Sequence, residues 1–162
     1  MEITIRAYRP ADRPALVRLL ETLQDYQAGR DPQRRLRRLP EYGELYTAET
    51  LEKVKKSGGI IYLAEAGGEV LGCIVGLVQE ATPVMRAAID WTRAGYIDDL
   101  VVKDGWRDKG VGSLLLAKLE DFFRAQGCQA AGMDVLIANA GAHDFYARRG
   151  YTERLTYMTR SL

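Results

Sequence analysis

The amino-acid sequence predicts a mixed α/β fold, and three observations support this class. Its 162 residues are enough for one buried core and too few for two ordinary domains. Strand-like apolar segments alternate along the chain with segments in which apolar residues recur at helical spacing. No repeat, low-complexity tract or linker divides the sequence, so we expect a single domain over residues 1–162.

In the first half of the chain, we expect two helices and then a hairpin. Asp12 is a candidate N-cap for a helix in which leucines recur at helical spacing, and Thr47 is a candidate cap for the next. An arginine-rich segment over residues 30–40 separates them and reads as a connection or a short helix. The pair Gly67-Gly68 between two apolar runs favours a hairpin. The expected elements are a strand near residues 1–5, helices over 12–23 and 47–56, and strands over 60–66 and 69–79.

In the second half, strands and helices alternate. Residues 81–94 form a less regular stretch, and Gly127 ends the long helix that follows. The whole chain therefore predicts about six strands around one sheet that is antiparallel at its start. The expected elements of this half are strands over 96–103, 131–138 and 151–160 and helices over 112–125 and 142–149.

The composition is that of an ordinary globular protein, with 47% hydrophobic and 28% charged residues and a net charge of +1. This charge predicts no general attraction to nucleic acid or to an anionic membrane surface. No apolar run approaches the roughly 20 residues that span a bilayer, and residues 1–5 lack the apolar block of a secretory signal. We therefore expect a cytoplasmic protein without nucleic-acid or membrane partners.

The sequence predicts no metal site. Cys73 and Cys128 lie in or beside apolar strand-like stretches and lack the spacing of metal ligands, so we expect two reduced core residues. The single histidine, His143, is expected on a helix surface, which makes zinc chemistry a poor interpretation.

The turn before helix 112–125 is the most informative segment, within the run LVVKDGWRDKGVGSLLL over residues 100–116. Its glycines, Gly105, Gly110 and Gly112, let the backbone approach a ligand closely. The first amides of the helix are unpaired and lie at the positive end of its dipole. Arg107 and Lys109 add positive charge beside them. Together these features predict a cradle for a pyrophosphate.

Two common phosphate loops do not fit this turn. A P-loop needs Lys and then Ser or Thr after Gly110, where the chain has Val111 and Gly112. A dinucleotide fingerprint beginning at Gly110 needs its third glycine where Leu115 stands. The remaining pattern is R-x-x-G-x-G, which Arg107, Gly110 and Gly112 satisfy.

With this pattern the sequence resembles the GNAT superfamily of N-acetyltransferases, whose members bind acetyl-CoA at R-x-x-G-x-G between the fourth strand and the third helix. The downstream run NAGAHDFYARRGY, from Asn139 to Tyr151, resembles the family's second cofactor motif, N-x-x-A-x-x-[LF]-Y-x-x-x-G-[FY]. The two motifs stand in family order, and the resemblance covers nearly the whole chain. It implies a mostly antiparallel sheet of about six to seven strands flanked by about four helices.

The resemblance also implies an acyltransferase that moves an acetyl group from acetyl-CoA to a primary amine without a metal. Backbone amides over residues 107–113 would hold the pyrophosphate, and the open edge of strand residues 100–102 would pair with the pantetheine amides. Asn139 either hydrogen-bonds the cofactor or caps its own helix. The expected cofactor-binding residues are Leu100, Val101, Val102, Arg107, Asp108, Lys109, Gly110, Val111, Gly112, Ser113, Asn139 and Tyr146.

Tyr146 is the candidate general acid, because the matching tyrosine of relatives lies near the thioester sulfur and can protonate the departing thiolate. A phenol with a pKa of about 10 still holds its proton at neutral pH. The alternative is an aromatic packing residue beside Phe145. The alternative function is a non-catalytic acyl-CoA-binding or regulatory module, which needs no such acid.

Acidic side chains are the candidates for the general base that deprotonates the amine. Strand alternation predicts that Asp98 and Asp99 point to opposite faces of the sheet, with one of them in the cleft. The run IDDL over residues 97–100 resembles the Glu-Asp-Leu/Phe run of polyamine acetyltransferases, which places the base at Asp98. Glu80, at the end of the neighbouring strand, is a second candidate. These acids favour a cationic acceptor such as a polyamine, an amino sugar or a protein amine. Relatives commonly form homodimers, so this assembly is an expectation as well.

Overall fold

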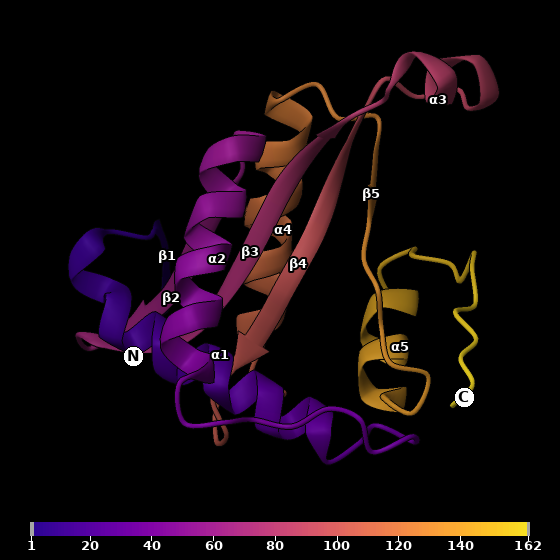
Figure 1. Ribbon diagram of the computed structural model, residues 1–162. Helices are drawn as coiled ribbons and strands as arrows, with labels where there is room; N and C mark the ends of the chain where they lie inside the picture. Colours follow the sequence, from indigo (N-terminus) through magenta and orange to yellow (C-terminus); the bar gives the residue numbers. More distant parts are fainter. Residues whose placement is uncertain (1, 162) are drawn as a thin grey trace.

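Within residues 2–161, which the computed structural model describes, the chain forms one five-stranded sheet with helices on both faces (Figure 1). The strand order follows the sequence, and every neighbouring pair is antiparallel except the last, which is parallel. The strands are β1 (Thr4–Ala7), β2 (Ile60–Ala66), β3 (Glu69–Glu80), β4 (Arg93–Val102) and β5 (Ala130–Gly132). The helices are α1 (Arg13–Ala28), α2 (Tyr42–Ser57), α3 (Pro83–Ala88), α4 (Val111–Ala125) and α5 (Ala140–Ala147), with a 3-10 turn η1 (Pro10–Asp12) before α1.

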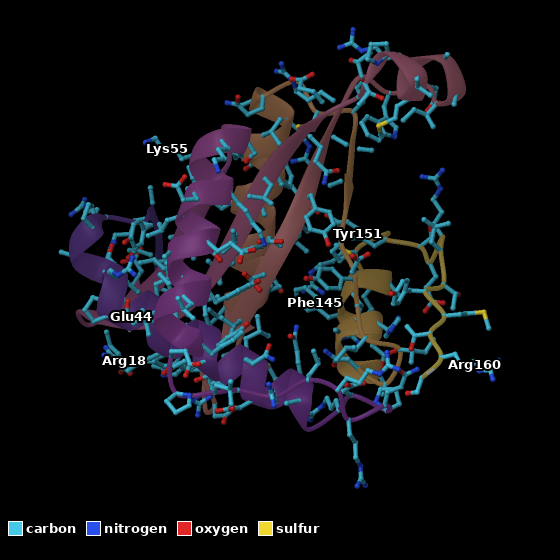
Figure 2. The ribbon with its side chains drawn as sticks, viewed as in Figure 1. Arg18, Glu44, Lys55, Phe145, Tyr151 and Arg160 are labelled. Atoms are coloured by element: carbon cyan, nitrogen blue, oxygen red, sulfur yellow. The ribbon has the colours of Figure 1, made fainter. Side chains whose placement is uncertain are left out.

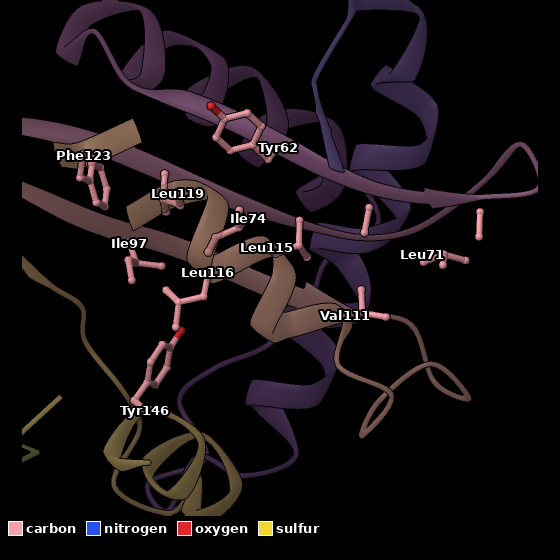
Figure 3. Packing of buried hydrophobic residues seen from close by; sticks show 12 residues of the cluster. Tyr62, Leu71, Ile74, Ile97, Val111, Leu115, Leu116, Leu119, Phe123 and Tyr146 are labelled. Carbon is pink, nitrogen blue, oxygen red and sulfur yellow. The ribbon is translucent and has the colours of Figure 1, made fainter. Parts of the chain in front are cut away.

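Two apolar layers hold the helices on the sheet. Leucines at positions 16, 19 and 20 share one face of α1 and pack, together with α2, on one side of the sheet. On the other side α4 packs its apolar stripe against the sheet (Figure 3). The buried members of this stripe are Val111, Leu115, Leu116, Leu119 and Phe123.

Two glycines let α4 approach the sheet closely. A Cβ atom placed on Gly76 would overlap the side chain of Leu119, and one placed on Gly95 would overlap the ring of Phe123. No room exists for a methyl group at either position unless the helix shifts. Glycine at these positions of β3 and β4 therefore sets the distance between α4 and the sheet.

We expect Gly95→Ala to lower the free energy of unfolding by about 1–3 kcal/mol, because the added methyl group overpacks the contact with Phe123. Urea unfolding followed by circular dichroism measures this change. Gly132→Ala is the matched control, since a Cβ atom there meets nothing within 4 Å. Equal stability of the two variants would show that the core around Phe123 adapts without strain.

The structure corrects four expectations about the elements. Helix α2 begins at Tyr42 rather than at Thr47, which is buried within the helix. Asp12 stands at the start of α1 without capping it, since its carboxylate accepts hydrogen bonds from the Arg6 guanidinium at 2.7 and 2.8 Å. Residues 83–88 form a helix, α3, where an irregular stretch was expected. The strand expected over residues 131–138 is reduced to β5.

The strand expected over residues 151–160 is absent from the described part of the chain, which explains the lower strand count. Leu155, Tyr157 and Met158 are strongly exposed there. A strand-like pattern forms a strand only where a sheet edge can pair with it. Because β5 ends at Gly132, residues 133–139 do not offer that edge. Within residues 2–161 no helix has the length and apolar character needed to cross a membrane.

Candidate active site

The turn between β4 and α4 ends in an open helix N-terminus. Gly105 and Gly110 have φ angles of +80° and +84°, a left-handed backbone that favours glycine. Gly110 directly precedes α4. The amides of Val111, Gly112 and Ser113, in the first turn of α4, donate no hydrogen bond to any residue between 2 and 161. These N–H groups and the helix dipole make this turn a site for an anion such as a pyrophosphate.

The second sequence motif packs directly against this turn. The ring of Phe145 in α5 lies 3.4 Å from the position of a Cβ atom on Gly112. The Arg149 guanidinium lies over that ring, 3.7 Å from its centroid, and donates a hydrogen bond to the Ser113 hydroxyl. Arg149 thus ties α5 to the first turn of α4. Sequence reasoning missed this role, because Arg149 stands at an unspecified position of the motif.

The cationic side chains of the turn mainly hold the turn itself. Arg107 donates from Nε to the Val102 carbonyl at 3.3 Å and pairs with Asp104 at 3.2 Å. Its guanidinium also stacks on the Tyr26 ring at 4.6 Å. Lys109 places its ammonium 5.1 Å from the centroid of the Trp106 ring. The backbone amides, rather than these side chains, are therefore the groups left without partners.

One edge of β4 is largely free. Along its other edge β4 pairs with β3 from Arg93 to Val102, but β5 pairs with it only from Ala94 to Tyr96. Beyond Tyr96 the outer edge of β4 has no strand partner among the described residues, and α5 lies off this edge (Figure 1). The open edge expected at residues 100–102 is thus present, beside the α4 N-terminus.

A β-bulge interrupts the β3–β4 ladder at the two aspartates. Val75 pairs with Asp99 and Gly76 pairs with Ile97, so Asp98 is the extra residue of β4. The bulge changes the alternation of side chains, because one residue is added without a partner on β3. Ile97 packs on the α4 side of the sheet, whereas Asp99 lies opposite Val75, which packs on the α1 and α2 side.

The expectation that Asp98 and Asp99 point to opposite faces is therefore wrong. Both side chains meet α2: the Tyr46 hydroxyl donates to Asp99, and the Lys53 ammonium lies 3.8 Å from Asp98 Oδ2. Alternation over a strand assumes an unbroken ladder, and the bulge breaks it. The result is a pair of carboxylates on one face beside the free edge of β4.

The two carboxylates differ in their surroundings. Asp99 is 6% exposed, and burial, together with the charge of Asp98, raises its pKa to about 7 although the hydrogen bond from Tyr46 lowers it. Burial also raises the pKa of Asp98, while the charge of Lys53 opposes this change. Lys53 is in turn held by Glu49 at 3.0 Å.

Tyr146 lies between α5 and α4, where its ring reaches toward Leu116 (Figure 3). The ring makes edge-to-face contacts with Phe145 and Tyr151 at 5.1 and 5.5 Å between centroids. Phe145 and Tyr151 lie on the side of α5 that faces β4 (Figure 2). Burial raises the pKa of Tyr146 to about 12, so its phenol keeps its proton at neutral pH.

Three further candidates lie in different settings. Glu80 pairs with Arg93 at 2.5 Å, five residues along β3 from Val75 and therefore about 17 Å from the aspartate pair. Asn139 caps α5 by accepting from the Ala142 amide at 3.3 Å, the second of its two expected roles. His143, 25% exposed in its side chain, pairs with Glu153 at 2.8 Å. The structure places the aspartates beside the free edge of β4 on the α2 side and Tyr146 in the cluster on the α4 side, with Glu80 away from the aspartates.

Comparison with known proteins agrees with this arrangement. Residues 17–151 match the model of the acetyltransferase (GNAT) family. The chain belongs to this family. The resemblance of the two motifs is thereby confirmed, and the GNAT match begins within α1 and ends at Tyr151, the last residue of the second motif.

Individual GNAT relatives match only part of this chain. An uncharacterized N-acetyltransferase of Methanocaldococcus jannaschii is 35% identical over 94 residues, which cover 57% of this chain and 53% of that protein. The aminoalkylphosphonate N-acetyltransferase of Salmonella typhimurium is 31% identical over 91 residues, covering 56% of this chain and 58% of that protein. The match thus spans little more than half the length of these relatives.

Solved structures share the whole GNAT fold. Glucosamine-6-phosphate N-acetyltransferase from Arabidopsis thaliana superimposes with a TM-score of 0.71 at 19% identity over 99% of both chains. A mutant of a Bacillus halodurans protein reaches a TM-score of 0.83 at 18% identity over 98% of this chain and 99% of its own. Identities this low relate the folds and carry no information about the acceptor.

Proposed function

We propose that this chain transfers an acetyl group from acetyl-CoA to a primary amine. One observation carries the proposal: the unpaired amides of Val111, Gly112 and Ser113 lie next to the free edge of β4. The amides fit the pyrophosphate of coenzyme A, and the edge at Leu100–Val102 fits the amides of its pantetheine arm. Such an arm, extended along β4 away from the turn, leads toward the aspartate pair.

The reaction places the amine nitrogen against the thioester carbonyl. As the C–N bond forms and the C–S bond breaks, the leaving thiolate takes up a proton, for which Tyr146 is the proposed donor. The phenol has a proton to give at neutral pH, because burial raises the pKa of Tyr146 to about 12. No metal is required for this chemistry, since the thioester is already activated.

The acceptor in this proposal is a cation. Asp98, Asp99 and Glu49 gather beside the free edge of β4 and are opposed there by Lys53. Two relatives are named for acetylating an aminoalkylphosphonate and glucosamine 6-phosphate, which carry an amine together with an acidic group. We propose instead a polyamine, an amino sugar without phosphate, or a protein amine for this chain, because the carboxylates repel a second acidic group.

Thiol release from acetyl-CoA in the presence of a panel of primary amines tests the proposal. We expect turnover with cationic amines, and slower turnover with amines that carry a phosphate. A chain that binds acetyl-CoA but releases no thiol with any amine would instead be the non-catalytic module.

We expect Tyr146→Phe to lower kcat about 100-fold and to leave the affinity for coenzyme A unchanged, because only the thiolate loses its proton donor. Steady-state kinetics and calorimetric titration of coenzyme A measure the two quantities. Tyr151→Phe is the matched control, since the Tyr151 hydroxyl donates to Glu120 at 2.9 Å and lies outside the proposed chemistry. Unchanged kcat in Tyr146→Phe would remove the acid role from Tyr146.

A further inference from the structure

Among residues 2–161, the Asp99 carboxylate has one hydrogen-bond donor, which comes from helix α2. Both carboxylate oxygens lie 3.2 Å from the Tyr46 hydroxyl. The Tyr46 ring is held in place by stacking on Tyr42, with 5.2 Å between centroids. A buried carboxylate satisfied by a single neutral hydroxyl is destabilising, so its presence calls for a functional explanation.

Asp98, the base that the sequence favours, is engaged differently. Its Oδ2 atom is buried, makes no hydrogen bond within the described residues 2–161, and faces the Lys53 ammonium at 3.8 Å. A positive charge at this distance stabilises the ionised carboxylate and makes it a weaker base. Asp99 faces a neutral phenol instead, so the two neighbours are not equivalent as proton acceptors.

Building on the proposed acetyl transfer, we propose that Tyr46 and Asp99 together accept the proton of the acceptor ammonium. Tyr46 is partly exposed and contacts the amine, while the buried Asp99 acts through it. An ammonium proton moves to the Tyr46 oxygen as the Tyr46 proton moves to an oxygen of Asp99. The neutral amine then attacks the thioester carbon, and Asp99 returns its proton to solvent after the product leaves. Asp98 binds and orients the cationic acceptor, and Lys53 holds the Asp98 carboxylate.

The groups around Asp99 are consistent with this role. Asp98 on β4 and Tyr42, Tyr46, Glu49 and Lys53 on α2 are the nearby titratable side chains, together with Cys73 on β3. Helix α1 presents leucines to this side of the sheet. Burial is the main cause that raises the pKa of Tyr146, and the charge of Asp99 adds to it. A carboxyl group with a pKa of about 7 can take a proton and release it again at neutral pH.

The pH dependence of kcat/KM, measured with a cationic amine, tests the inference. In the wild type we expect a rise with a midpoint near pH 7. Asp99→Asn and Tyr46→Phe are expected to lose about 100-fold at pH 7 and to rise only as the acceptor amine itself becomes neutral. Asp98→Asn is expected to keep the rise but to move its midpoint below that of the wild type, because the charge of Asp98 no longer raises the pKa of Asp99, and to raise KM.

Tyr42→Phe provides the matched control, because it removes a hydroxyl from the same aromatic stack without touching Asp99. A midpoint that survives in both Asp99→Asn and Tyr46→Phe, or one that disappears only in Asp98→Asn, overturns the inference. If Asp99→Asn does not fold, Tyr46→Phe alone decides between these outcomes. A wild type that acetylates no amine would instead contradict the proposed function, so the two failures are distinguishable.

Discussion

Gly112→Asp is expected to weaken the binding of acetyl-CoA by at least about 100-fold, or roughly 3 kcal/mol. The new carboxylate would stand in the first turn of α4, where the amides of Val111, Gly112 and Ser113 are without partners. It would occupy those amides itself and repel the pyrophosphate. Its Cβ atom would also come within 3.4 Å of the Phe145 ring, which fixes α5 against the turn. Calorimetric titration of coenzyme A measures the loss directly.

Two variants control this experiment. Gly29→Asp introduces the same charge beyond the end of α1, where a Cβ atom makes only ordinary contacts at 3.6 and 3.8 Å, and we expect no change in affinity. Gly112→Ala adds the Cβ atom without the charge and should bind coenzyme A within a few-fold of the wild type. If Gly112→Asp binds like Gly112→Ala, the helix N-terminus is not the pyrophosphate site.

The part of the site proposed to bind coenzyme A could be predicted from the sequence, because it is formed by residues that are close together in the chain. Glycines with positive φ, an apolar strand and an amphipathic helix lie within one short run, and each depends on neighbouring residues. The second motif is equally local, and its packing against Gly112 needed only the predicted order of elements. Even here Arg149 was missed, since its contact with Ser113 joins two segments that are far apart in sequence.

The acceptor half of the site does not follow from local patterns. Whether Asp98 and Asp99 share a face depends on a bulge, which reflects how β4 fits β3 rather than any residue type in β4. Tyr46 and Lys53 were unremarkable in the sequence, because they gain their partners only when α2 packs on the sheet. The strand expected over residues 151–160 is absent for a related reason: a strand requires an available sheet edge, and the described part of the chain places none beside these residues.

The buried Asp99 should make the stability of the protein depend on pH. Its pKa is raised from 3.8 to about 7 in the folded state. Between these values the folded chain holds a proton that the unfolded chain has released, so the free energy of unfolding falls as pH rises through this window. Below about pH 4 Asp99 costs the folded state nothing through this shift. Above pH 7 the loss of unfolding free energy is complete, at up to about 4 kcal/mol from a shift of roughly three pKa units.

Asp99→Asn should therefore be more stable than the wild type at pH 8, by up to about 4 kcal/mol, and nearly equal to it at pH 4. The asparagine does not titrate, and its carbonyl can still accept the Tyr46 hydrogen bond. Urea unfolding at a series of pH values measures the difference. Tyr46→Phe serves as the opposite control, because it removes the hydrogen bond that lowers the pKa of Asp99 and extends the falling limb to higher pH.

A difference between Asp99→Asn and the wild type that does not change with pH would show that the pKa of Asp99 is the same in the folded and the unfolded chain. The expected result has a further consequence when it is joined to the kinetic experiment. A variant that is more stable at pH 8 but about 100-fold slower at pH 7 would mean that the wild type retains a destabilising carboxylate for its chemistry. If Asp99 had only a structural role, Asp99→Asn would be less stable than the wild type at every pH and would keep the wild-type midpoint of kcat/KM.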